Sequence, residues 1–296
     1  MKRFGISIIT AFALSLVTAS TIAHAGTINL CTGGEGGPYH TAGKMIAKQM
    51  VGSGTDVVVK TSSGTWDNIQ RSTGDEPDCN AFVGQPDGHA VFARENKAEA
   101  SNLRKVATLH REYLHVLCNA ASGVDALDEL ESDPAGNGYS VAVGEVGSGS
   151  WLIWQNFIVE DEDYAAVPTH NDGDIFALTG VASGTYTCML VPAGLGNSVV
   201  TSADNDFSGE LVLASAVDKD FNDAVDPKGD PLYEFEDIPG DTYETSLQRG
   251  WGGSVETVSW LAGVYVNSSQ IDRKDLANFM KGANRAKAQI RAEYGS

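Results

Sequence analysis

The feature that most constrains the fold is a repeated order of apolar run, glycine-containing turn and amphipathic segment. The run TINLC precedes the glycine-rich TGGEGGPYH and the segment Ala42–Val51, where apolar residues recur at helical spacing. The run DVVVKTS (56–62), a helical segment starting near Thr65 and the run CNAFVGQ (79–85) continue this order. A β-α-β-α-β order predicts a parallel sheet covered by helices on both faces.

The order restarts in the second half of the chain, after the strand-like runs LRKVATLH and EYLHVLCN. Residues 139–157 give a strand, a Gly/Ser turn and a helix, and residues 175–194 give a helix, a strand and another glycine turn. We therefore expect two similar α/β lobes rather than one sheet. Segment 218–240 is acidic, contains three prolines and predicts a long surface loop. A last helix, with Asp272 as N-cap, has the expected apolar face Leu276, Phe279, Met280, Ala283 and Ile290.

The first 25 residues have the pattern of a cleavable signal peptide. Lys2 and Arg3 precede an apolar stretch too short to span a bilayer, and Ala23-His24-Ala25 is an A-x-A cleavage site. We expect an exported, periplasmic protein that begins at Gly26 and does not insert into the membrane.

The strongly acidic composition excludes several kinds of partner. The formal net charge is −19. Such a surface argues against nucleic acid and anionic lipid as ligands. The charge does not identify the ligand, because a binding site can differ from its surroundings.

Three turns, Thr32–Gly37, Ser62–Thr65 and Gly147–Ser150, combine glycine with serine or threonine just before a helix. Glycine lets a ligand approach the backbone, and the free N–H groups of a first helical turn attract anions. One such turn is more often plain helix capping. Three of them at equivalent places in two lobes favour a facing pair of anion-binding surfaces. Trp66 and Trp151 follow two of these turns and either contact the ligand or belong to the core.

Enzyme and metal motifs are missing or incomplete in the sequence. The first turn lacks the Lys-Ser/Thr pair of a P-loop and the third glycine of G-x-G-x-x-G. There is no G-x-S-x-G and no H-E-x-x-H, and the run from Asp218 departs from an EF-hand loop at Asp223 and Gly229. We expect no catalytic residue, no metal site and no cofactor.

The segments LCTGGEGGPYHTAGKMIAKQM, VKTSSGTWDNIQ, CNAFVGQPDG and VGEVGSGSW resemble successive signatures of the TRAP-associated extracytoplasmic immunogenic (TAXI) family. The resemblance covers nearly all of the expected mature chain. It implies a type II periplasmic binding fold of two α/β lobes, with a cleft and crossing hinge strands. It also implies a monomeric receptor that delivers a small organic acid or amino acid, glutamate-like or another carboxylate, to membrane-embedded TRAP permease subunits. The alternatives are an enzyme on the same bilobal fold and a ligand-loaded sensor subunit for a membrane receptor kinase.

In that fold we expect one lobe at 26–113 plus 252–296 and a second at 114–251, with hinge strands near 110–115 and 253–260. The expected ligand-binding set is Thr32, Gly33, Gly36, Gly37, Tyr39, Ser63, Gly64, Thr65, Trp66, Gln85, Ser148, Gly149, Ser150, Trp151 and Asn197.

The chain has four cysteines and no C-x-x-C motif, so an exported protein of this kind should contain one or two structural disulfides. In the implied fold, Cys118 and Cys188 lie at the same sheet edge on antiparallel strands, which predicts a bond between them. Cys31 and Cys79 match poorly, because they fall at opposite ends of parallel strands.

Overall fold

The computed structural model describes residues 26–243, 245–248 and 253–295. The expected signal peptide, residues 1–25, lies outside these ranges. The strands are β1 (Gly26–Cys31), β2 (Thr55–Lys60), β3 (Ala81–Gly84), β4 (Leu103–Asn119), β5 (Val141–Ala142), β6 (Thr169–His170), β7 (Cys188–Ala193), β8 (Leu211–Ala214), β9 (Glu234–Ile238) and β10 (Val255–Asn267). The helices are α1 (Pro38–Met50), α2 (Thr65–Thr73), α3 (Pro86–Glu95), α4 (Lys97–Ala100), α5 (Pro134–Asn137), α6 (Gly149–Glu160), α7 (Asp174–Ala182), α8 (Ser198–Asp206) and α9 (Arg273–Tyr294), with 3-10 turns η1 (Leu127–Glu131), η2 (Glu162–Ala166) and η3 (Lys219–Asp223).

The strands form a mixed sheet in the order β2-β1-β3-β10-β4-β7-β5-β6, with β8 on β4 and β9 on β10. Strands β1, β2 and β3 are parallel, and so are β5, β6 and β7. Strands β4 and β10 run antiparallel to their neighbours. The α/β fold class expected from the sequence is confirmed, because each parallel group alternates with helices along the chain.

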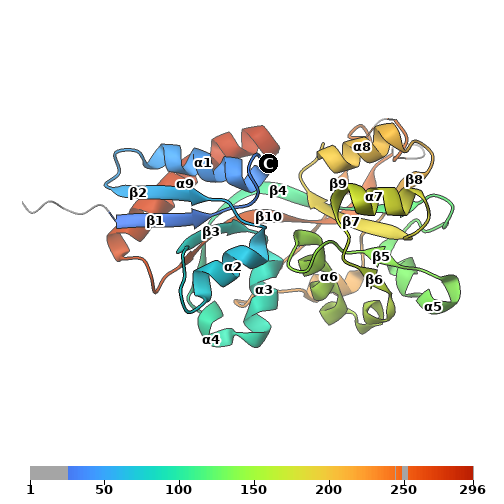
Figure 1. Cartoon of the computed structure of the whole chain (residues 1–296), viewed down its shortest axis with the longest axis horizontal. Coiled ribbons are helices and arrows are strands. Elements are labelled where there is room, and N and C mark those ends of the chain that lie inside the picture. Colours follow the sequence, from blue (N-terminus) through green and yellow to red (C-terminus); the bar gives the residue numbers. More distant parts are fainter. Residues whose placement is uncertain (1–25, 244, 249–252, 296) are drawn as a thin grey trace, which may run out of the picture.

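The two long strands β4 and β10 join the two parallel groups, which lie at opposite ends of the molecule in Figure 1. Strand β4 pairs with β10 up to Glu112 and with β7 from Tyr113. Strand β10 pairs with β9 up to Ser259 and with β4 from Trp260. The hydrogen-bond ladder is therefore continuous, and the expectation of two separate sheets is wrong in this respect. Both exchanges of partner fall within the segments expected to act as hinges.

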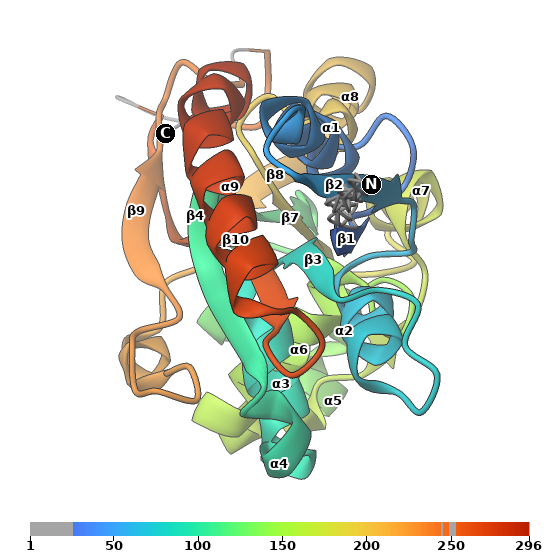
Figure 2. The ribbon, with the colours of Figure 1, turned by 90° about the vertical axis from the view of Figure 1, so that its left-hand side faces the viewer.

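Each half of the sheet has its own apolar core. In the first half, α1 and α9 cover one face of β1 and β3, and Ile28, Ile46 and Phe279 are buried between them. Figure 2 shows α9 lying along β4 and β10, beside α1. Met280 is 38% exposed, so its expected place on the apolar face of α9 is wrong. The N-cap role of Asp272 is confirmed, since its carboxylate accepts hydrogen bonds from the first turn of α9.

Two further expectations are corrected by long-range pairing. The runs read as two strands, LRKVATLH and EYLHVLCN, are one 17-residue strand, β4. The segment 218–240, read as a loop, contains η3 and also β9, which is held by pairing with β10. The sequence of β9 is acidic and mostly exposed, so it carries no apolar alternation from which a strand would be predicted.

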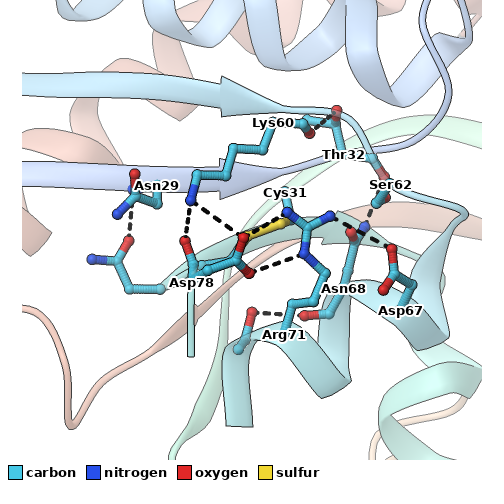
Figure 3. The surroundings of a disulfide bond; sticks show 12 residues. Asn29, Cys31, Thr32, Lys60, Ser62, Asp67, Asn68, Arg71 and Asp78 are labelled. Atoms are coloured by element: carbon cyan, nitrogen blue, oxygen red, sulfur yellow. Dashed lines mark hydrogen bonds and ion pairs between the residues drawn. A yellow bond between two sulfur atoms is a disulfide. The ribbon is translucent and has the colours of Figure 1, made fainter. Parts of the chain in front are cut away.

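The four cysteines form two disulfides. Cys118 and Cys188 lie directly opposite each other on β4 and β7, with their Cα atoms 4.0 Å apart, as expected. Cys31 and Cys79 also form a disulfide, with a Cα separation of 5.9 Å, so the expected mismatch is wrong. Cys79 precedes β3, and its N–H donates to Arg71 in α2, so its backbone is not yet in strand register with β1. Figure 3 shows this bond under the end of β1.

Candidate functional site at the helix starts between the two halves

Three helices of the first half begin at the carboxyl ends of β1, β2 and β3. Their N-cap residues are Gly37 for α1, Gly64 for α2 and Gln85 for α3. None of the three accepts a hydrogen bond from its helix through a side chain. First-turn N–H groups and the positive ends of the helix dipoles therefore converge at one edge of the sheet, where open α/β folds bind ligands.

Backbone contacts hold the first two turns together. The Ser62 N–H donates to the Gly33 carbonyl at 3.2 Å. The Asn68 side-chain NH₂ donates to the carbonyls of Thr32 at 2.7 Å and Val83 at 2.9 Å, so α2 ties β1 to β3. The Thr32 hydroxyl donates to the Lys60 carbonyl at 2.9 Å. Thr32 is fully buried. Any contact between this turn and a ligand is therefore expected from backbone groups and not from the Thr32 hydroxyl.

An ion-pair network lies beneath the second turn (Figure 3). Arg71 makes two 2.9 Å bonds to the Asp78 carboxylate and donates to the Thr61 carbonyl at 2.8 Å. Lys60 also reaches Asp78, and its ammonium donates to the backbone carbonyl there. The hydrogen bonds from Arg71 hold the pKa of Asp78 at about 2. Lys60 and Arg71 are thus both paired with Asp78, so the N–H groups of the turn are its donors for an anion.

The third turn opens the second half of the site, at the start of α6. Gly144 and Gly147 have φ values of 77° and 88°, which only glycine adopts without strain. The Ser148 hydroxyl caps α6 by accepting from the Trp151 N–H at 3.2 Å. The Ser150 hydroxyl donates to the Leu190 carbonyl at 2.8 Å. Both serines therefore have structural roles in addition to the ligand contact expected of them.

The third turn touches residues of the first half at the starts of α2 and α3. A Cβ added to Gly149 would overlap the Gln85 carboxamide, and one added to Gly147 would lie 3.1 Å from the Trp66 side chain. The rings of Trp66 and Trp151 meet edge to face, with centroids 6.1 Å apart. The Gln85 N–H donates to the Thr65 hydroxyl at 3.1 Å. The structure thus brings together Thr65, Trp66, Gln85, Gly149 and Trp151 of the expected set, while Gly33 is bonded to Ser62 within the first half.

Other members of the expected ligand-binding set lie on the same turns, and their contacts described below stay within one half. Gly36 has a φ of 83° in the first turn, and the Ser63 N–H donates to Asp67 in the second. Asn197 lies elsewhere, at the start of α8, where its side chain accepts from the Val199 N–H. The neighbouring Gly196 N–H donates to Tyr243, not to any of the three turns.

Two buried acidic residues beside these turns were missed by the sequence analysis. Glu112 is 6% exposed and accepts hydrogen bonds from the Tyr39 hydroxyl and the Trp260 indole N–H, both at 2.9 Å. Asp87, in the first turn of α3, is fully buried, and burial raises its pKa to about 7. The sequence could have indicated that Glu112 is a candidate site residue, because Glu112 is the one carboxylate within the strand-like stretch 103–119.

Two groups of acidic or sulfur side chains in the described residues have ligand atoms close enough together to hold a metal ion. Cys31, Asp78 and Cys79 are close together because of the disulfide. The other group joins Glu131, Asp161 and Asp218, whose ligand atoms lie within 4.8 Å of one another. Burial, and then the neighbouring carboxylates, raise the pKa of Glu131 to about 7. Asp218 caps the 3-10 turn η3, in the stretch whose sequence departs from an EF-hand loop.

Two cavities lie away from the three turns. One of about 490 Å³ is lined by Asp125, Ser215 and Leu247, and one of about 430 Å³ by Phe235 and Asp237, with Glu256 shared between them. Both are next to β9 and the start of β10. At the turns themselves, the Gln85 carboxamide lies against Gly149 and the Trp66 side chain lies against Gly147.

Known binding proteins share this fold. The chain superposes on MatC from Rhodopseudomonas palustris with bound malate at a TM-score of 0.53 and 17% identity, over 90% of this chain and 86% of that one. A binding protein component of an ABC phosphonate transporter from Pseudomonas aeruginosa gives 0.52 and 11%, over 91% and 79%. The periplasmic binding protein BugD gives 0.51 and 12%, over 91% and 87%.

Sequence comparison supplies the family. No curated protein sequence matches the chain. Within the described ranges, none of the helices has the length and apolar character needed to cross a membrane. The profile of the NMT1-like family matches residues 30–273, which is most of the chain, and the solved neighbours are solute-binding proteins of bilobal form. The chain belongs to the NMT1-like family.

Proposed function

We propose that the protein is a periplasmic solute receptor that captures a small organic anion or amino acid and delivers it to a TRAP-type membrane permease. The family and the fold of its neighbours support a binding role. The TRAP partner rests on the resemblance of four sequence segments to the TAXI family, as does the expected class of carboxylate ligand.

One observation carries the binding site. The starts of α2 and α3 lie directly against the start of α6, with Gln85 against Gly149 and Trp66 against Gly147. The turn before α1 is tied to the turn before α2 by the bond from the Ser62 N–H to the Gly33 carbonyl. A carboxylate placed there meets backbone N–H donors and positive dipole ends from both halves.

Backbone N–H groups are the main anion donors in this proposal. The hydroxyls of Thr32, Ser148 and Ser150 already take part in internal hydrogen bonds. No arginine or lysine occurs in the turns 32–37, 62–65 or 147–150. Charge-assisted bonds from N–H groups to a carboxylate are short and strong, so a handful of them suffices for tight binding.

The two halves act as lobes that close on the solute. We place the first lobe at 26–113 plus 252–296 and the second at 114–251; the boundary at 251/252 lies outside the described residues. Closure bends β4 and β10 where each strand exchanges its pairing partner. A few residues at the ends of paired segments are sufficient to absorb such a hinge motion.

The test is mass spectrometry of the small molecules that copurify with the protein and are released on denaturation. We expect one small carboxylate in near-stoichiometric amount, absent from a Gly149→Trp variant that fills the space between the halves. A released molecule that carries no anionic group, or equal release from wild type and variant, would contradict the proposal.

A further inference from the structure

The positive charges of this acidic protein are concentrated in one of its two halves. Residues 114–251 contain 25 Asp or Glu and three Lys or Arg. Residues 26–113 and 252–296 together contain 14 Asp or Glu and 15 Lys or Arg. The two halves of the sheet lie at opposite ends of the molecule in Figure 1. The excess of negative charge therefore belongs to the second half, and the first half is nearly neutral.

Helices α1 and α9 carry many of the first-half cations. Helix α9 contains six Lys or Arg and two acidic residues, and α1 contains two Lys and no acidic residue. The helices lie side by side over the first-half sheet (Figure 2). Gly282 of α9 packs closely on the Met50 sulfur of α1, and the Asn278 side chain donates to the Ser53 carbonyl at 3.1 Å. The exposed sides of the two helices therefore form one layer.

Helical spacing places the exposed cations of α9 on one stripe. Lys274, Lys281 and Arg285 are separated by seven and four residues, which brings their side chains onto the same side of the helix. Of the two acidic residues of α9, Asp275 is buried and Glu293 lies in the last turn. The stripe is therefore positive over most of its length.

The exposed sides of α1 and α9 are named the basic face here, and its cations are Lys44, Lys48, Lys274, Lys281 and Arg285. All five side chains are exposed. Among the described residues, no ion pair involves any of the five. The charge of the basic face is therefore not neutralised by carboxylates in direct contact with it.

The basic face is suited to an extended anionic surface rather than to a small anion. Its cations are spread along two helices, and α9, with 22 residues, is about 33 Å long. The two cavities described above lie beside β9, away from this face. Exposed apolar side chains accompany the cations, since Val51 after α1 is 85% exposed and Met280 on α9 is 38% exposed. Cations with apolar side chains among them are typical of helical surfaces that contact lipid headgroups.

We propose that the basic face binds a membrane surface rich in anionic phospholipid, without inserting into the bilayer. The net charge of −19 argues against such a surface as a ligand of the acidic second half, but it does not describe this face. Charges in physiological salt are screened beyond about 8 Å, so the second half does not cancel the attraction. Its repulsion from the lipid instead orients the protein, with the first half toward the membrane. This role is independent of the identity of the solute.

The test is flotation of the protein with lipid vesicles. Vesicles of phosphatidylcholine alone are compared with vesicles that also contain phosphatidylglycerol, at about 0.05 M and about 0.5 M salt. We expect binding to the anionic vesicles at the lower salt concentration only. The combined variant Lys274→Gln, Lys281→Gln and Arg285→Gln should bind about a hundredfold more weakly, because each cation near such a surface contributes about fivefold.

A matched control removes the same amount of positive charge elsewhere. The combined variant Lys97→Gln, Lys219→Gln and Lys228→Gln changes three exposed cations that lie on neither α1 nor α9. It should bind the anionic vesicles as wild type does. Equal losses in the two variants would overturn the proposal, because they would mean that only the net charge matters.

Other outcomes that would overturn the proposal are visible in the wild-type protein alone. They are no binding to the anionic vesicles, binding that the higher salt concentration leaves unchanged, and equal binding to both kinds of vesicle. Poly-L-glutamate serves as a soluble acidic probe. Binding of this probe without binding of vesicles would mean that the basic face serves an acidic protein partner and that the membrane is not its ligand. Solute affinity enters none of these measurements, so the proposed function is tested separately.

Discussion

The most specific consequence of the buried Asp87 is an unusual dependence of stability on pH. Burial, and then the charge of Glu112, raise the pKa of this carboxyl from 3.8 to about 7 in the folded protein. Between these two values the folded state holds a proton that the unfolded state has released, so the free energy of unfolding falls as the pH rises. Each pH unit is worth about 1.4 kcal/mol. The free energy of unfolding stops changing about one pH unit above the folded-state pKa.

Asp87→Asn removes this titration while keeping the size of the side chain. The stability of the variant relative to wild type should therefore rise by about 3 kcal/mol between pH 5 and pH 8, with most of the change below pH 7. The charges of Glu112 and Arg94 contribute to the pKa of Asp87, and the charge of Asp87 in turn raises the pKa values of Tyr39, Tyr233 and Tyr265.

Urea unfolding of both proteins at pH 5, 6, 7 and 8 measures the difference. The exposed Asp56→Asn variant is the control, and its difference from wild type should stay constant over this range. Parallel profiles for Asp87→Asn and wild type would refute the reasoning, because they would mean that Asp87 ionises in the folded chain as it does in the unfolded chain.

Three further outcomes follow from the contacts. Replacing Cys118 and Cys188 by serine opens a loop with a sequence separation of 70 residues and should cost about 4 kcal/mol in urea unfolding, and a loss under 1 kcal/mol would contradict this. Ser148→Ala removes the cap of α6 and should lower stability by about 1 kcal/mol even without solute, so an unchanged urea midpoint would count against the cap. Gly149→Ala places a methyl group against the Gln85 carboxamide. The variant should lose more binding free energy, measured by calorimetry, than free energy of unfolding, followed through its melting temperature.

The alternation of strands and helices was predictable from the sequence because it is local. Apolar runs, glycine turns and helical spacing lie within short windows, and they located β1, α2 and α6 to within a few residues. The Cys118–Cys188 bond followed from strand direction in the fold implied by the family resemblance. The acidic strand β9 was not predictable, since its pairing with β10 comes from a distant segment.

In the candidate site, too, features set by short sequence segments were predictable, and features set by contacts between distant segments were not. The turns that begin α1, α2 and α6 were expected, and contacts between Gln85 and Gly149 bring their halves together. The roles of Ser148 and Ser150 within the fold were missed. A serine near a helix start has the same sequence pattern whether its hydroxyl caps the helix or binds a ligand. Asp87 and Glu112 were missed because their burial depends on segments distant in sequence, as the bond from the Trp260 indole N–H to Glu112 shows.

The central claim is that backbone N–H groups from both halves hold the solute. Hydrogen exchange followed by mass spectrometry, with and without the copurified solute, measures those groups directly. The account predicts slower exchange in peptides that cover residues 32–41, 63–68, 85–89 and 147–152, on both sides of the crossing strands. Protection confined to one half, or centred on residues 212–217 and 254–256 beside the larger cavity, would contradict it.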